Sequence, residues 1–323
     1  MDLTVITVCR NAAPTIQRCI DSVSPLLRHP VLSVEHLIID GVSTDATLEI
    51  LTEQLAMGRI TRFISEPDGG IYDAMNKGIA LAAGKVCVFI NADDEINAEA
   101  VESCCAPILS GEVDYTVSTV RIMSEEGEMT GIQKPDFSRE WMNTPYCHQS
   151  MFCRTEMLRR EGGFRLDLGI SADCALMWHL YKKQYPYRIV EAVSAHFYSG
   201  GASSGVGLYS DHLRIYLENS VDILQSAAID AQYRKFALKH LRSYMRLLSE
   251  NEVNECKISP LIAQAAALHK VIVGTMPSRG RLFLWLSYKR QYLINKFGAL
   301  FSKKRKRTKQ SRCFIYSYLS KFC

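Results

Sequence analysis

The first 90 residues alternate short apolar runs with longer stretches of helical periodicity. This alternation is typical of a mostly parallel sheet flanked by helices, because two parallel strands need a crossover between them, usually a helix. It predicts strands over 3–8, 36–39, 62–65 and 85–90, and helices over 15–27, 46–56 and 70–83. Ligands of such sheets bind at the carboxyl ends of the strands. The polar residues that follow each strand are therefore the candidates for function.

The rest of the chain has a more mixed pattern. A strand is expected over 115–123 and a helix over 156–161. After about Asp211 glycine and proline become sparse and the pattern is helical. We therefore expect an α/β domain over 1–212 and a helical C-terminal region over 213–323.

Composition narrows the class of protein. The 323 residues are 47% hydrophobic and 22% charged, which is a globular rather than a disordered composition. The 11 cysteines contain no C-x-x-C pair, so we expect reduced structural thiols rather than a zinc site. The first residues lack the basic-then-apolar order of a signal peptide, and no apolar stretch is long enough to span a membrane. We expect a cytoplasmic protein.

Two carboxylates follow the fourth predicted strand, in the segment Asn91-Ala92-Asp93-Asp94. Carboxylates at the end of a buried strand are costly unless water, a cation or hydrogen-bond donors meet them. Carboxylate oxygens are ligands that Mg²⁺ and Mn²⁺ take in phosphate chemistry, with diphosphate oxygens and water completing the shell. The alternative is that Asp94 is the N-cap of a helix that begins near Asn97.

A second polar cluster, SEPDGGIYDAMNKG, follows the third predicted strand. Asp73, Asn76 and Lys77 are spaced to share one face of the helix over 70–83, which is either part of a binding site or simply solvated. We expect Gly84 to be the C-cap of this helix.

These segments and several others resemble, in order, the family 2 glycosyltransferases, whose catalytic domain has the nucleotide-binding, Rossmann-like α/β fold of type A. The resemblance runs from Leu3 to about Ser204 and is strongest to the branch that builds bacterial capsule, exopolysaccharide and O-antigen chains. Several ordered blocks are far more specific than one motif. The blocks are TVITVCRNA, IIDGVSTDAT, SEPDGGIYDAMNKGIALAAGK, FINADD, HQSMF, ISADCALMWHL and HFYSGGASS.

The resemblance implies an inverting, metal-dependent transfer of a sugar from a UDP- or GDP-sugar to an acceptor hydroxyl of a saccharide, free or lipid-linked. It makes 1–95 the nucleotide-sugar-binding half of the catalytic domain and 96–212 the acceptor half. Mn²⁺ or Mg²⁺ is the implied cofactor. Two other hypotheses are a catalytically inactive scaffold of a polysaccharide assembly complex, and a sugar nucleotidyltransferase. A sugar nucleotidyltransferase should carry a glycine-rich phosphate loop near the first strand, where this chain instead has CRNAAPT.

On the donor side, the resemblance implies that Asp40 reads the nucleotide base and that the backbone from Thr7 to Arg10 lines the base and ribose. Asn76 and Lys77, with Asp73, belong to the helix that closes over the nucleotide. Asp93 is implied to face the ribose and Asp94 to bind the metal. Asn91 replaces the first acid of the commoner D-x-D motif, so we expect no more than a hydrogen bond from it.

On the acceptor side, Asp173 matches the catalytic base of the family, and His148 and Gln149 match an acceptor-side pair. A carboxylate base that removes the proton of the attacking hydroxyl implies a single displacement and hence inversion. Two structural alternatives remain. Asp173 could be an N-cap or first-turn acid stabilised by the helix dipole, and His148 could be a hydrogen-bonded core residue.

The tail over 279–309 alternates apolar and basic residues and ends in the run KKRKRTK, whose six basic residues outweigh the chain's net charge of +4. One interpretation is an interfacial helix on the inner face of an anionic cell membrane. The other is a helix packed on the catalytic domain with a solvated basic end. We expect no nucleic-acid binding, because no base-stacking platform or recognised motif accompanies the run.

Overall fold

A computed structural model describes residues 1–137, 144–200, 211–215 and 217–218 of the chain. The chain divides into two compact units, 1–204 and 205–323, and nearly all the described residues belong to the first. Most of the helical C-terminal region expected over 213–323, including the basic tail, lies outside the described residues. No helix in the described part of the chain is long and apolar enough to cross a membrane.

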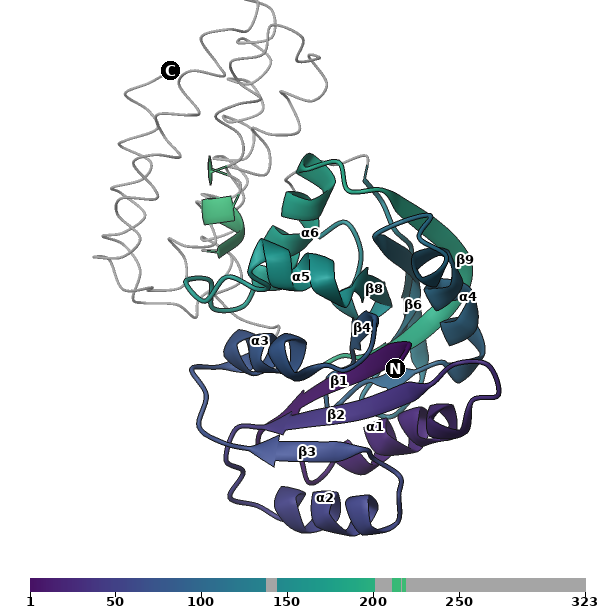
Figure 1. Ribbon diagram of the computed structural model, residues 1–323. Coiled ribbons are helices and arrows are strands. Elements are labelled where there is room, and N and C mark those ends of the chain that lie inside the picture. The colour runs from purple at the N-terminus through teal and green to yellow at the C-terminus, as the bar shows by residue number, and fades with distance from the viewer. Residues whose placement is uncertain (138–143, 201–210, 216, 219–323) are drawn as a thin grey trace, which may run out of the picture. The chain divides into compact units, whose positions relative to one another are not determined.

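The first half of the fold is the parallel sheet that the sequence predicts, with neighbouring strands in the order β3, β2, β1, β4 (Figure 1). The register pairs Cys9 with Asp40 and Asp40 with Ser65, so the carboxyl ends of three strands meet at one edge. The bounds are Leu3–Cys9 for β1, Val34–Asp40 for β2, Arg62–Ser65 for β3 and Val86–Phe89 for β4.

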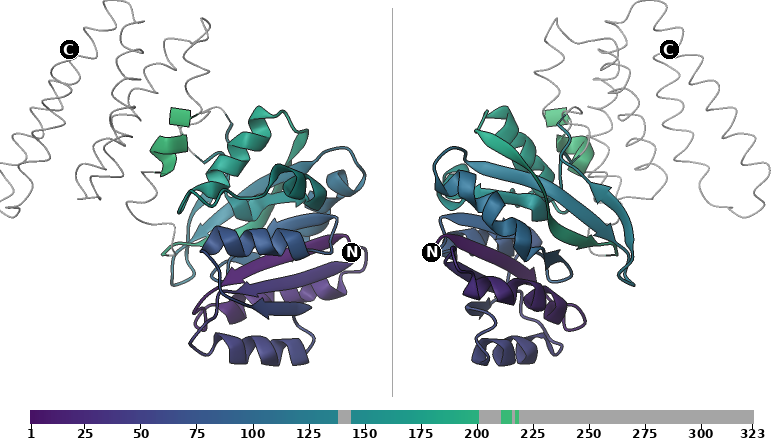
Figure 2. Two further views of the ribbon diagram at one scale, coloured as in Figure 1. Left: turned by 60° about the vertical axis from the view of Figure 1, so that its left-hand side comes forward. Right: turned by 90° about the vertical axis from the view of Figure 1, so that its right-hand side faces the viewer.

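The helices of this half cover both faces of the sheet. Helices α1 (Ile16–Val23) and α2 (Thr47–Ala56) lie on one face, and α3 (Ile71–Leu81) lies on the other (Figures 1 and 2). The helix predicted over 15–27 is in fact α1 followed by the 3₁₀ helix η1 (Ser24–Arg28). Pro25 at the start of η1 has no N–H to continue the α-helical hydrogen bonds.

Gly84 is not the C-cap that we expected. Helix α3 ends at Leu81, and Ala82 takes the capping position with an extended ψ of 132°. A Cβ atom on Gly84 would collide with the backbone of Leu3 and Thr4, and its N–H donates to Thr4 Oγ1 at 2.8 Å. Glycine is needed there because two chain segments pass close together.

The second half extends the sheet with mixed pairing. Strand β8 lies antiparallel between β4 and β6 and so joins the two halves, whereas β6 and β9 are parallel. The strand predicted over 115–123 is β6, and the helix predicted over 156–161 is α5. The bounds are Glu95–Ile96 for β5, Ala98–Leu109 for α4, Tyr115–Met123 for β6, Met129–Gln133 for β7, His148–Ser150 for the 3₁₀ helix η2, Met151–Arg154 for β8, Thr155–Glu161 for α5, Ala172–Lys182 for α6 and Tyr187–Tyr198 for β9.

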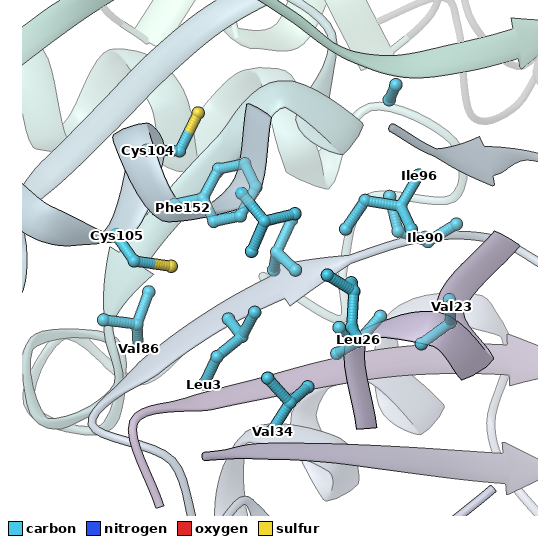
Figure 3. Close-up of a cluster of buried hydrophobic side chains, with 14 of the residues drawn as sticks. Leu3, Val23, Leu26, Val34, Val86, Ile90, Ile96, Cys104, Cys105 and Phe152 are labelled. Atoms are coloured by element: carbon cyan, nitrogen blue, oxygen red, sulfur yellow. The ribbon is translucent and has the colours of Figure 1, made fainter. Parts of the chain in front are cut away.

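A single apolar cluster links the two halves (Figure 3). Leu3 of β1, Val34 of β2 and Val86 of β4 pack in it with Cys104 of α4 and Phe152 of β8. All five side chains are at most 7% exposed. Because strands and helices of both halves contribute, the polar ends of β1, β2 and β4 are held in a fixed relation to the segment around η2.

Candidate active site

Asp40 ends β2, and its side chain is fully buried. Its carboxylate accepts hydrogen bonds from Ser43 N at 3.0 Å, from Ser65 Oγ at 2.6 Å, from Ser43 Oγ and, at 3.6 Å, from Cys9 Sγ. A carboxylate offers about four lone-pair sites, and these four donors use them. Asp40 therefore fixes the loop after β2 against the ends of β1 and β3, and these donors compete for its carboxylate with the nucleotide base that the resemblance assigned to it.

Thr7 and Arg10 lie at the end of β1 but in opposite environments. The Thr7 side chain is fully buried and its Oγ1 lies 3.0 Å from His36 Nε2. Burial lowers the pKa of His36 to about 3, so this imidazole is neutral. Arg10 is exposed at the carboxyl edge of the sheet. Of the two side chains, the one that a ligand at this edge can reach is that of Arg10.

One side of α3 holds the loop over 66–70. Asp73 Oδ2 accepts from Gly69 N at 2.9 Å. Lys77 Nζ donates to Pro67 O at 2.6 Å and lies 2.9 Å from Glu66 Oε1, and the hydrogen bond with Glu66 raises the pKa of Lys77. The loop at the carboxyl end of β3 is thus fastened to the first two turns of α3.

Asn76 does not share this side of α3. Its Nδ2 donates to Phe164 O and its Oδ1 accepts from Phe164 N, both at 2.8 Å. Asp73, Asn76 and Lys77 all lie in α3 as predicted, but the amide of Asn76 binds the segment before α6, whereas Asp73 and Lys77 bind the loop over 66–70. Asn76 joins α3 to the second half of the fold.

Asp94 is fully buried and is held from two directions. Gln149 Nε2 donates to its Oδ2 at 2.6 Å, and Tyr198 N donates to its Oδ1 at 3.0 Å. Burial, and secondly the charge of Asp93, raise its pKa to about 7. The alternative role as a helix N-cap is wrong, because the N-cap of α4 is Asn97, whose side chain accepts from Glu99 N.

The backbone at Asp93 is held by Arg18, which the sequence did not single out. Arg18 Nη2 donates to Asp93 O at 2.7 Å, and its guanidinium lies 3.6 Å from the ring centroid of Tyr198. Arg18 Nε also lies 3.7 Å from Glu95 Oε1. No local signal marks Arg18, which belongs to a helix 75 residues earlier in the chain.

The residues of this segment fit a divalent cation. Asp93 and Asp94 are adjacent carboxylates, and Asn91 Oδ1 is buried without a hydrogen-bond partner among the described residues. Burial, and secondly the charge of Asp93, disfavour the ionised form of Asp94, and a cation bound there would offset both effects. Within residues 1–137 and 144–200, no group of three or more His, Cys, Asp or Glu side chains could hold a metal by itself, so a cation there would complete its shell with other oxygens.

Asp173 lies in the first turn of α6 and is 20% exposed. Its Oδ1 accepts from Tyr72 OH at 3.0 Å, and its Oδ2 lies 3.3 Å from His148 Nδ1. Burial by itself would raise the pKa of Asp173, but the hydrogen bond and charge of His148 and the hydrogen bond of Tyr72 bring it below its ordinary value. Ser171 is the N-cap residue of α6, so Asp173 is not the cap, and it has partners beyond its own helix.

The 3₁₀ helix η2 brings the two acids into one site. Its first residue, His148, contacts Asp173, and its second, Gln149, contacts Asp94. The two acids are 79 positions apart in the sequence. The structure thus unites four of the predicted site residues and adds Tyr72, which lies inside one of the sequence blocks without having been singled out.

Comparisons with known proteins agree with this architecture. The model of the family described as glycosyl transferase family 2 matches residues 4–181. The chondroitin synthase of Pasteurella multocida strain Pm70 is 34% identical over 137 residues, which are 42% of this chain and 14% of that protein. A PGL/p-HBAD biosynthesis glycosyltransferase of Mycobacterium tuberculosis H37Ra is 31% identical over 178 residues, 52% of this chain and 65% of that protein. The chain therefore spans less than two thirds of the length of either relative.

Solved structures share the fold at low sequence identity. S. aureus TarS 1-349 in complex with UDP has a TM-score of 0.55 and 18% identity, covering 87% of this chain and 82% of that one. The mannosyltransferase PcManGT from Pyrobaculum calidifontis, in complex with GDP-Man and Mn²⁺, has a TM-score of 0.52 and 15% identity, covering 98% and 84%. These similarities confirm the α/β fold that the sequence predicts.

Proposed function

The chain belongs to glycosyl transferase family 2, and we propose that it transfers a sugar from a nucleotide diphosphate sugar to an acceptor hydroxyl, with inversion, in the synthesis of a cell-surface polysaccharide. The observation that carries the proposal is the pair of adjacent residues His148 and Gln149, which hold Asp173 and Asp94 in one site. The relatives named as chondroitin and hyaluronan synthases support a polysaccharide product.

The donor would bind at the carboxyl ends of β1, β2 and β4. Structural neighbours solved with UDP, UDP-GlcNAc and GDP-Man support a nucleotide sugar as donor. In this chain the accessible groups there include Arg10, the loop over 66–70 and Asp93. Asp40 and Asn76 act indirectly, since their polar atoms already bind protein groups.

Asp94 is the proposed metal ligand, with Asp93 beside it and with Asn91 Oδ1, which has no partner in the part of the chain that the structure describes. A divalent cation held by these residues would supply positive charge to offset the negative charge of the departing diphosphate. Gln149 and Tyr198 keep the Asp94 carboxylate in a fixed orientation. Lys77 lies at the loop over 66–70, where its ammonium pairs with Glu66 and holds the backbone at Pro67 on the donor side.

Asp173 is the proposed general base. Its lowered pKa keeps it ionised at neutral pH, so it is ready to accept the proton of the acceptor hydroxyl as that oxygen attacks the anomeric carbon. A carboxylate that takes a proton and does not itself attack carbon gives one displacement, and the configuration inverts. Such a base typically contributes about 10² to 10⁴ in rate.

A thermal-shift panel of nucleotide diphosphates with and without Mn²⁺ tests the donor and the metal together. A ligand at 100 times its dissociation constant stabilises the folded state by about 2.7 kcal/mol, and we expect this only for a diphosphate nucleotide with the metal present. The anomeric configuration of the product, followed by NMR, tests inversion. A shift that ignores the metal, or a product with retained configuration, contradicts the proposal.

The tail over 279–309, which lies outside the described residues, is the proposed membrane-binding segment. Its basic amphipathic pattern suits an anionic membrane surface, which would present a lipid-linked saccharide to the site. Sedimentation with anionic vesicles, weakened by salt, is the expected result for the full chain. A chain that stays in the supernatant at low salt contradicts the membrane part alone.

A further inference from the structure

Helix α3 has two sets of contacts, each spaced one turn apart. Asp73 and Lys77 hold the loop over 66–70, as described above. Tyr72 and Asn76 instead hold the segment that leads into α6 and Asp173. One rigid element therefore touches both the proposed donor side and the proposed base.

The contacts of Tyr72 are specific. Its hydroxyl lies 2.5 Å from Ile170 O and 3.0 Å from Asp173 Oδ1, and both are acceptors for its single hydrogen. Its ring is 7% exposed and stacks on Phe164, with centroids 5.5 Å apart. Burial and the charge of Asp173 raise the pKa of Tyr72, so the hydroxyl keeps its proton and stays a donor.

We propose that Tyr72 is a positioning residue that orients the Asp173 carboxylate for proton removal and ties it to the helix that fastens the loop over 66–70. This inference rests on the proposed function, in which Asp173 is the base. With His148 at one oxygen and Tyr72 at the other, the carboxylate cannot rotate without breaking a contact. A base held in one orientation is more effective than a freely rotating one.

The Tyr72 hydroxyl also favours the charged form of Asp173. The polar groups that face this carboxylate are Tyr72 of α3, His148 of η2 and the N–H of Cys174 on its own helix. The Cys147 and Cys174 thiols also interact with its charge. Of these, Tyr72 can lose its donor without changing the charge of the site, because phenylalanine keeps the ring and removes only the hydroxyl.

The test compares Tyr72→Phe with the wild type. We expect kcat for transfer to fall about tenfold or more, the scale for losing a hydrogen bond to a charged group, while KM for the donor stays the same. The acid limb of the pH–rate profile should move to higher pH, because the pKa of Asp173 rises when a donor to its charged form is lost. The matched control is Tyr115→Phe, which removes another buried hydroxyl. That hydroxyl has no hydrogen-bond partner among the described residues, so the control should change neither kcat nor the pH–rate profile.

A second variant separates this inference from the proposed function. In an Asp173→Asn background, Tyr72→Phe should cause no further loss, because Tyr72 acts through the carboxylate. If Asp173→Asn itself transfers at the wild-type rate, the proposed base is wrong. If Asp173→Asn is inactive but Tyr72→Phe keeps the wild-type kcat and pH profile, only the positioning role is wrong, and the Tyr72 hydroxyl serves the backbone at Ile170. A further tenfold loss in the double variant also contradicts the proposal.

Discussion

Gln149 Nε2 donates to Asp94 Oδ2 at 2.6 Å, from a side chain that is 1% exposed to one that is fully buried. The residue before it, His148, contacts Asp173. Two neighbouring residues of a three-residue 3₁₀ helix therefore set the positions of the proposed metal ligand and the proposed base. The predictions below test each part of that arrangement.

Gln149→Leu should weaken Mn²⁺ binding by about 10- to 100-fold, the range for residues that orient a metal ligand. Leucine keeps most of the volume but leaves Asp94 Oδ2 without its donor. Calorimetric titration of Mn²⁺ with a nucleotide diphosphate present measures the effect. Gln17→Leu is the control, because the Gln17 amide pairs with Asp21 on the surface of α1. Equal affinities for the two variants would mean that Gln149 does not support a metal site.

Asp94→Asn should abolish the metal-dependent part of nucleotide diphosphate binding while the protein stays folded. Asparagine resembles the protonated acid in shape, whereas alanine would leave both Gln149 Nε2 and Tyr198 N unpaired, at about 1 to 3 kcal/mol each. The same titration checks it, with Asp21→Asn on the surface of α1 as control. Unchanged Mn²⁺-dependent affinity in Asp94→Asn would place the metal elsewhere.

The buried carboxyl of Asp94 should also make stability depend on pH when no divalent cation is present. Its pKa is raised from 3.8 to about 7, so the folded state keeps a proton that the unfolded chain has lost. The contribution of this carboxyl to the free energy of unfolding is fully present below about pH 4 and is lost as the pH rises through about 7. The total loss is at most about 4 kcal/mol. Denaturant unfolding in a chelator, from pH 5 to about 8, should show this fall in the wild type and a flatter profile in Asp94→Asn. If the stabilities of the wild type and Asp94→Asn change in parallel with pH, the Asp94 carboxyl is not the source of the pH dependence.

Asp173→Asn should leave nucleotide-sugar binding close to wild type and lower transfer by about 10² or more, because the proton acceptor is lost while shape and polarity stay. Hydrolysis of the donor by water should fall in parallel. Steady-state kinetics with calorimetry of donor binding check both. The control is Asp167→Asn, because Asp167 pairs with Arg165 on the surface. This variant should change neither transfer nor donor binding. A folded Asp173→Asn enzyme with wild-type transfer would contradict the assignment of Asp173 as the base.

Asn76→Ala should destabilise the protein rather than weaken donor binding. The backbone N and O of Phe164 would both lose their partner, which costs about 2 to 6 kcal/mol if each unpaired group costs about 1 to 3. Denaturant unfolding measures the loss. Asn76→Asp can still accept from Phe164 N and should lose less than alanine. A variant of wild-type stability with weakened nucleotide affinity would restore Asn76 to the donor site.

Much of the first half of the fold could be read from the chain, because its signals are local. Strands β1 to β4 are apolar runs, and polar residues follow each of them at the edge where ligands bind, so Asp93 and Asp94 could be named from the sequence. The ends of elements were less certain. Helix α1 ends earlier than predicted because Pro25 begins a 3₁₀ helix. Gly84 is needed where the chain passes close to the backbone of β1, not at the end of a helix.

The roles of individual polar residues were decided by tertiary structure. An aspartate or asparagine at a strand end or on a helix can bind a ligand or a backbone group, and which one it binds depends on what the fold brings to it. Asp40 and Asn76 found protein partners. Gln149 reached Asp94 across 55 positions, and Tyr72 reached Asp173 across 101. The sequence by itself determined the sheet, its functional edge and the residue types present there, since these follow from periodicity and burial. Which of those residues face one another was decided only by tertiary structure. The packing of β8, η2 and α6 against α3 and β4 brought distant segments of the chain together.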